Sequence, residues 1–181
     1  MTDTIQRALS RAIEKALGIN AVQPRAVSDE ELARALYRIA GKGYVPSEQI
    51  IEPLRAWLQG YALLLTGDAG VGKTFLMRCL AVRLYSAEAI ADYGLHGVHK
   101  WYEWTDSKTV CIDDLGTERV TAEYGAKDDV LKAVISHRER GQKGLTHVTT
   151  NLTAEQIASR YGDRTLSRLL GMCKAFRFEG D

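Results

Sequence analysis

The sequence predicts an α/β fold in which a parallel β-sheet is covered by helices on both faces. Short apolar runs alternate along the chain with segments of helical spacing, which is the pattern of strands joined by crossover helices. The apolar run at residues 61–65 leads into a glycine-rich turn, and the run at residues 109–112 ends in two aspartates. The 181 residues suffice for one such domain with a short appendage, and a formal net charge of +1 gives no overall attraction to nucleic acid.

The amino-terminal part of the chain is predicted to form a helical arm. Apolar residues recur at every fourth position over residues 5–17, which is typical of an amphipathic helix. A second helix is predicted to begin after Ser28, because Glu31 three positions later completes a capping box. These helices either pack on the rest of the chain or bind a partner, and both alternatives stay open. We place the boundary between this arm, residues 1–43, and the main domain, residues 44–181, at a glycine-containing joint.

The elements of the main domain follow from the same patterns. A short helix over residues 53–59 leads into the strand before the glycine-rich turn, and a helix over residues 75–86 follows that turn. We expect one further strand between residues 87 and 108. Beyond the strand at 109–112, the spacing predicts a helix over 126–140, a strand over 145–150, helices over 154–161 and 165–170, and a last strand over 175–178. No apolar run approaches the length that crosses a bilayer, so we expect a cytoplasmic protein.

The glycine-rich turn matches the phosphate-binding pattern GxxxxGK[ST]. Its glycines can adopt positive φ and curl the backbone amides around phosphate groups, which a Cβ atom would obstruct. Lys73 can bridge the β- and γ-phosphates, the hydroxyl of Thr74 can bind Mg²⁺, and the helix that begins here turns its positive end toward the anion. We therefore expect a nucleoside triphosphate to bind Gly67, Asp68, Ala69, Gly70, Val71, Gly72, Lys73, Thr74 and Phe75.

Polar residues at the ends of the later strands supply candidate catalytic groups. Asp113 is the natural partner of Mg²⁺ from outside its direct ligands or through a water molecule, and Asp114 can polarise the attacking water or is merely a cap or loop residue. Asn151 ends the next strand, where it can orient that water or cap the following helix. Arg164 and Arg168 lie one helical turn apart, where one guanidinium can reach a γ-phosphate across a subunit boundary; solvent exposure is the alternative.

Together these motifs resemble the DnaC/IstB branch of the AAA+ ATPases, which contains bacterial and phage helicase loaders and transposition helper proteins. The likeness covers about residues 44–181 and rests on the segments LLLTGDAGVGKT, VCIDDLGTE, HVTTNL and YGDRTLSRLL. It implies an ASCE-type P-loop three-layer sandwich. We expect a minimal or absent carboxyl-terminal lid, in departure from fuller AAA+ proteins, because the sequence stops soon after Phe178. The likeness implies catalytic roles for Lys73, Asp113, Asp114 and Asn151, with Mg²⁺ at Thr74 and Asp113, Arg164 as an arginine finger acting in trans, and Arg168 as a second nucleotide sensor.

The resemblance also implies ATP as the nucleotide, ATP-dependent homo-oligomers, and single-stranded DNA and a replicative helicase as partners. Aspartate reaches less far than glutamate, so Asp114 predicts slow, partner-stimulated hydrolysis. An ATPase that assists a transposase is the alternative that the core motifs do not separate, and a small-molecule P-loop kinase or a nucleotide-binding adaptor is less consistent with them. The aromatic segment at residues 100–104 can stack on bases, with core packing of its rings as the alternative.

Overall fold

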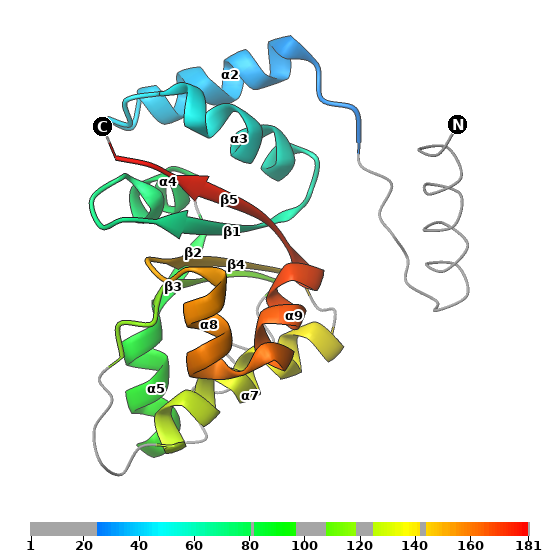
Figure 1. Cartoon of the computed structure of the whole chain (residues 1–181). Coiled ribbons are helices and arrows are strands. Elements are labelled where there is room, and N and C mark those ends of the chain that lie inside the picture. The colour runs from blue at the N-terminus through cyan, green and yellow to red at the C-terminus, as the bar shows by residue number, and fades with distance from the viewer. Residues whose placement is uncertain (1–24, 81, 97–107, 119–124, 142–143, 181) are drawn as a thin grey trace, which may run out of the picture.

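The computed structural model describes residues 25–80, 82–96, 108–118, 125–141 and 144–180. Five strands of these residues form one sheet in the order β2-β3-β4-β1-β5, in which every neighbouring pair is parallel (Figure 1). The strands are β1 (Ala62–Gly67), β2 (Arg83–Ser86), β3 (Thr109–Leu115), β4 (Leu145–Thr150) and β5 (Cys173–Phe178). Because all five run in one direction, their carboxyl ends meet at the same edge, where ligands bind in open α/β sheets.

Helices cover both faces of this sheet, so the predicted parallel α/β fold is confirmed (Figure 1). They are α2 (Asp29–Ala40), α3 (Ile51–Leu58, after a 3₁₀ turn at Glu48–Ile50), α4 (Lys73–Cys79), α5 (Ala87–His96), α7 (Gly125–Gly141), α8 (Ala154–Tyr161) and α9 (Asp163–Met172). One apolar core lies under α2, α3 and α4, and a second lies under α5, α7, α8 and α9. Leu63 and Leu65 of β1 belong to the first core and Leu64 to the second, as the alternation of a strand requires.

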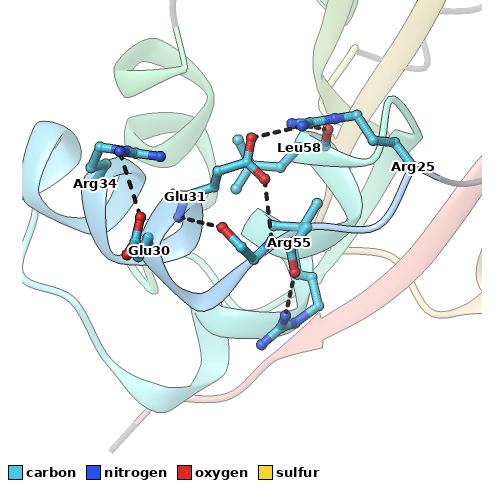
Figure 2. A network of polar contacts seen from close by, with 8 residues as sticks. Arg25, Glu30, Glu31, Arg34, Arg55 and Leu58 are labelled. Carbon is cyan, nitrogen blue, oxygen red and sulfur yellow. Dashed lines mark hydrogen bonds and ion pairs between the residues drawn. The ribbon is translucent and has the colours of Figure 1, made fainter.

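Helix α2 packs on the main domain rather than standing apart from it. Its capping box is present: the Ser28 hydroxyl accepts from the Glu31 amide, and the Glu31 carboxylate accepts from the Ser28 amide, each at 3.2 Å. Arg25 pairs with Glu31 at 2.6 Å and reaches the Leu58 carbonyl of α3, in the polar network of Figure 2. The buried face of α2 joins the core of α3 and α4 through Leu32, Ala35 and Ile39.

For α2, the structure therefore supports packing on the main domain. The first predicted helix, over residues 5–17, lies outside the described residues. A division of the chain at residue 44 stays a prediction.

The segment after the phosphate loop differs from the prediction. The helix predicted over residues 75–86 ends at Cys79, and its last four predicted residues form the strand β2, which pairs with β3. The prediction of a further strand between residues 87 and 108 is wrong for residues 87–96, because these residues form α5. Residues 97–107 lie outside the described residues. Four residues at the sheet edge are too few for strand and helix spacing to be distinguished, and the pairing with β3 decides the outcome.

A neutral histidine lies in the middle of the sheet. His147 of β4 is fully buried, and its Nδ1 accepts a hydrogen bond of 3.1 Å from the Leu63 amide. Burial, together with the smaller effect of the positive charge of Arg138, lowers the pKa of this imidazole to about 4. Among the described residues, Nε2 has no hydrogen-bond partner. His147 is thus a structural group that must stay uncharged.

Candidate nucleotide-binding site

The phosphate loop joins β1 to α4 at the carboxyl edge of the sheet. Gly67, Gly70 and Gly72 have φ values of 131°, 87° and 92°, the positive values that the sequence pattern predicts. A Cβ on Gly67 would lie 2.0 Å from the carbonyl oxygen of Phe178, so only glycine lets β5 approach the loop this closely. At Gly72, which caps α4, a Cβ would meet the Tyr44 hydroxyl at 3.1 Å. The backbone therefore takes the curled form that directs amides toward an anion.

Lys73 lies at the start of α4 and is 4% exposed. Its Nζ donates to the carbonyl oxygens of Gly67 at 2.7 Å and Asp68 at 2.6 Å, and to Asn151 Oδ1 at 2.8 Å. Burial lowers the pKa of the ammonium group, and the negative charges of Asp114, Asp68 and Asp113 oppose that shift in this order. The cation is thus held at the loop by oxygens that a phosphate could replace.

Asn151 is brought to the phosphate loop by its hydrogen bond to Lys73. The alternative in which it caps the following helix is wrong, because Thr153 occupies the cap of α8. The Thr153 hydroxyl accepts from the Gln156 amide, and Gln156 closes a capping box. Asn151 is therefore available to the site, as a residue at the end of a central strand.

Thr74 and Asp113 place two oxygen atoms side by side. The Thr74 hydroxyl donates to Asp113 Oδ1 at 2.9 Å, and the Thr149 hydroxyl of β4 donates to the same oxygen at 2.6 Å. Thr149 in turn accepts from the Asp114 amide at 2.9 Å. Hydroxyl and carboxylate oxygens are the ligands that Mg²⁺ prefers, so Thr74 and Asp113 fit this ion. Thr149 was not predicted, because its only signal in the sequence is its position next to the last residue of a buried strand.

Asp114 has an unusual backbone. Its φ of 56° is positive, and it is the only residue other than glycine with a positive φ in the part of the chain that the structure describes. Such a conformation costs on the order of 1 kcal/mol and is tolerated best by aspartate, asparagine and glycine. Burial raises the pKa of the Asp114 carboxyl, the charge of Asp113 raises it further, and Lys73 opposes both. Strain and a raised pKa in one carboxylate are typical of a functional group.

A cavity of about 360 Å³ lies between the loop and these side chains. It is lined by Ala69, Gly70, Gly72, Lys73, Thr74, Phe75, Arg78, Asp114, Thr117 and Asn151. A second cavity of about 570 Å³ shares the loop and extends toward Tyr44 and Val45, with the Tyr44 ring stacked on Phe75 at 5.7 Å between centroids. Arg78 and Thr117 were not predicted; Arg78 lies one helical turn after Thr74, which is the signal that could have found it.

The two predicted arginines are not brought to these cavities within one chain. Arg164 lies exposed in the first turn of α9 and is not among the lining residues of either cavity. Arg168 pairs with Glu139 of α7, with Nε and Oε2 separated by 3.0 Å. A role of either residue toward nucleotide stays a prediction. The aromatic segment at residues 100–104 lies outside the described residues.

Comparisons with solved structures agree with this fold. The chain is similar to the DnaC helicase loader at 18% identity, with a TM-score of 0.54, over 87% of this chain and 95% of that one. It is similar to DnaI at 18% identity, with a TM-score of 0.55, over 85% of this chain and 87% of that one. AMPPCP-bound DnaA from Aquifex aeolicus matches at 14% identity, with a TM-score of 0.55, over 77% of this chain but 50% of that one. The predicted resemblance to DnaC-like AAA+ ATPases is thus confirmed at the level of the fold.

No curated protein matches the chain. In the part of the chain that the structure describes, no helix is long and apolar enough to span a membrane. A family model, novel STAND NTPase 3, matches residues 44–169. This match includes the phosphate loop, both aspartates and Asn151, and it identifies a nucleotide-binding P-loop NTPase. Because the match covers more than half of the sequence, the chain belongs to the novel STAND NTPase 3 family.

Proposed function

We propose that the protein hydrolyses ATP and uses the bound nucleotide as a switch. The observation that carries this proposal is the convergence of two separate segments beside the phosphate loop: Lys73, Thr74 and Asp114 line one cavity, and Thr74 binds Asp113. A lysine, two adjacent oxygens for a metal and a carboxylate of raised pKa are the groups that phosphoryl transfer to water requires. The amide of Asn151 on the same cavity supports hydrolysis rather than transfer to a second substrate.

Each residue has a distinct role in this proposal. Lys73 binds the β- and γ-phosphates with the donors that now face the loop carbonyls and Asn151. Thr74 and Asp113 would hold Mg²⁺, directly or through water, and the ion would neutralise part of the phosphate charge. Asp114 accepts a proton from the attacking water, which Asn151 orients. Because Asp114 is short and its backbone is fixed at a positive φ, we expect slow turnover.

A second subunit completes the site in this proposal. Arg164 is exposed, and it lines neither cavity of its own chain, so it is free to reach the γ-phosphate of a neighbouring subunit. A guanidinium supplied in trans accelerates phosphoryl transfer by about 10³-fold to 10⁵-fold. Hydrolysis would then depend on an ATP-dependent homo-oligomer, and assembly would set the rate.

We further propose that this switch acts as a helicase loader, with a replicative helicase and single-stranded DNA as partners. The support is the similarity of fold to DnaC, described as a helicase loader, and to DnaI, each over at least 85% of this chain. In this role ATP favours assembly on the partner, and hydrolysis resets the complex. The amino-terminal arm, residues 1–43, is the segment that we assign to partner choice.

Labelled ATP tests the hydrolysis. With Mg²⁺ and no acceptor, the wild-type protein should release labelled phosphate, whereas a small-molecule kinase would retain the label until an acceptor is added. Lys73→Ala and Arg164→Ala subunits should each be inactive but should recover activity when mixed, because a Lys73→Ala subunit can still donate Arg164. An assembled mixture without activity would disprove the finger, and the absence of ATP uptake in calorimetry with Mg²⁺ would disprove the site itself.

The loader role needs a separate experiment. Asp114→Asn protein should bind ATP without hydrolysing it, and immobilised on a column it should retain the host's replicative helicase with ATP but release it with ADP. Lys73→Ala protein is the matched control and should retain no helicase with either nucleotide. Equal retention under all conditions, or none by any variant, would contradict a nucleotide-gated loader while leaving the ATPase proposal in place.

A further inference from the structure

A buried carboxylate stands just beyond the catalytic acids. Glu118, four residues after Asp114, is 2% exposed. Its Oε1 accepts a hydrogen bond from the Tyr161 hydroxyl and lies 3.0 Å from Arg160 Nη2, while its Oε2 accepts from the Gly116 amide at 3.0 Å. Removing a carboxylate from water is costly unless it is paired and hydrogen-bonded, as this one is.

Arg160 holds the same loop through its backbone. Its Nη1 donates to the Gly116 carbonyl and its Nη2 to the Glu118 carbonyl, each at 2.6 Å. The loop that follows β3 is therefore attached to the end of α8 by charged side chains and by two backbone carbonyls. We call Glu118, Arg160 and Tyr161 the buried brace.

The buried brace has the catalytic acid at one end. Thr117, between Gly116 and Glu118, donates from its hydroxyl to the Asp114 carbonyl at 2.9 Å and from its amide to the same oxygen at 3.1 Å. Thr117 also lines the cavity of the proposed nucleotide site. A displacement of Asp114 would therefore move the loop that Glu118 and Arg160 hold.

The predicted arginine finger stands at the other end. Tyr161 ends α8, and its carbonyl accepts from the buried Thr165 hydroxyl of α9 at 2.9 Å. Arg164 precedes Thr165, so the turn that presents Arg164 is fixed to the same residue that binds Glu118. Hydrogen bonds, joined by the covalent links from Thr117 to Glu118 and through Tyr161, thus connect the loop of Asp114 to the turn of Arg164.

We propose that the buried brace couples the proposed ATP site of a subunit to the arginine finger that this subunit offers to its neighbour. Glu118, Arg160 and Tyr161 are positioning residues, and they contact neither nucleotide nor metal. The inference rests on the proposed hydrolysis and on Arg164 acting in trans. The physical basis of the inference is that the buried brace contacts both the loop of Asp114 and the turn of Arg164. A packed element that contacts two sites can carry energetic coupling between them.

Subunit mixing separates this role from a structural one. The brace variants are Glu118→Gln, which removes the charge, and Tyr161→Phe, which removes one hydroxyl. Mixed with Lys73→Ala, a brace variant supplies the ATP site and receives an intact finger. Mixed with Arg164→Ala, it supplies the finger to an intact site. The reference is Lys73→Ala mixed with Arg164→Ala, and the control is Tyr37→Phe, the same change at a tyrosine that is 82% exposed.

Mixed with Lys73→Ala, each brace variant should hydrolyse ATP at about the rate of the reference mixture. Mixed with Arg164→Ala, it should hydrolyse ATP at least about 10-fold more slowly than the reference, since a displaced arginine finger stabilises the transition state less well. ATP affinity, measured by calorimetry, should stay within about 2-fold of the wild type because the phosphate loop is intact. Equal activity in both mixtures, or equal loss in both, would overturn the coupling. A reference mixture that recovers nothing would overturn the trans finger, and the brace proposal with it. Variants that unfold are recognised by lost ATP affinity, and Tyr161→Phe, the mildest change, then decides.

Discussion

The buried His147 makes a quantitative prediction about acid stability. Its pKa is about 4 in the folded protein and 6.5 in the unfolded chain, because burial disfavours the charged imidazole. Below pH 6.5 the unfolded state binds a proton that the folded state does not, so the free energy of unfolding falls as the pH falls toward 4. Each pKa unit corresponds to about 1.4 kcal/mol, so the loss attributable to this residue is about 2 kcal/mol at pH 5 and about 3 kcal/mol near pH 4.

Urea unfolding at pH 7.5, 6 and 5 measures this effect, with His147→Asn as the matched variant. Asparagine keeps an oxygen that can accept from the Leu63 amide but does not titrate. The variant has a smaller side chain and should be less stable at pH 7.5, but its stability should decline less with acid. The difference between the two slopes cancels the contributions of the carboxylates that both proteins share. A wild-type protein that loses no more stability than His147→Asn between pH 7.5 and 5 would refute the assignment of a neutral, buried imidazole.

Three further predictions concern the nucleotide site and the loop that follows β3. Thr74→Ser should keep Mg²⁺-dependent ATP binding in calorimetry, whereas Thr74→Ala should lose the Mg²⁺ dependence; equal behaviour would exclude a hydroxyl ligand. Asp114→Asn should bind ATP normally but hydrolyse it about 10²-fold to 10⁴-fold more slowly. Because the pKa of Asp114 is raised, the ATPase activity of the wild type should begin to fall at a higher pH, as the solution is acidified, than it would with an aspartate of ordinary pKa. Gly116→Ala should lower the urea midpoint by the equivalent of about 1–3 kcal/mol, because φ is 105° and the new Cβ would lie 2.6 Å from Leu152 Cδ1; an unchanged midpoint would contradict the close packing.

Local patterns were enough to predict the phosphate loop and most strands of the sheet. The glycine pattern predicts positive φ at Gly72, and the continuous apolar run of β1 predicts a strand buried on both faces, as observed. Strand β2 could not be predicted, because its four residues have no resolvable period and are fixed by pairing with β3. Patterns of hydrophobicity describe one segment at a time, whereas an edge strand depends on its neighbour.

The site was predictable where it depends on one segment and not where it depends on several. Asp113 and Asp114 could be identified from the strand that precedes them. The two interpretations of Asn151 could not be separated until the cap of α8 was known to be Thr153. Nothing in the local sequence distinguishes Glu118 from an ordinary solvent-exposed loop residue. Only the fold shows that its carboxylate is buried against α8. Contacts between side chains far apart in sequence carry no local periodicity.

The strand order explains why β4 supplies so much of the site. β4 lies between β1 and β3, so the residues after β1 and those at the end of β3 can meet only across its carboxyl end. Thr149 fills that position with a small hydroxyl, which bonds Asp113 on one side while leaving Thr74 within 2.9 Å of the same carboxylate oxygen. Asn151, at the same end, reaches Lys73. Helix α8 follows directly from this strand end, so any shift there is passed to α8 along the backbone as well as through Glu118. The backbone and the Glu118 contacts together constrain the position of α8 relative to the nucleotide site more than either link alone. We therefore expect the position of Arg164 to change with the nucleotide state rather than independently of it.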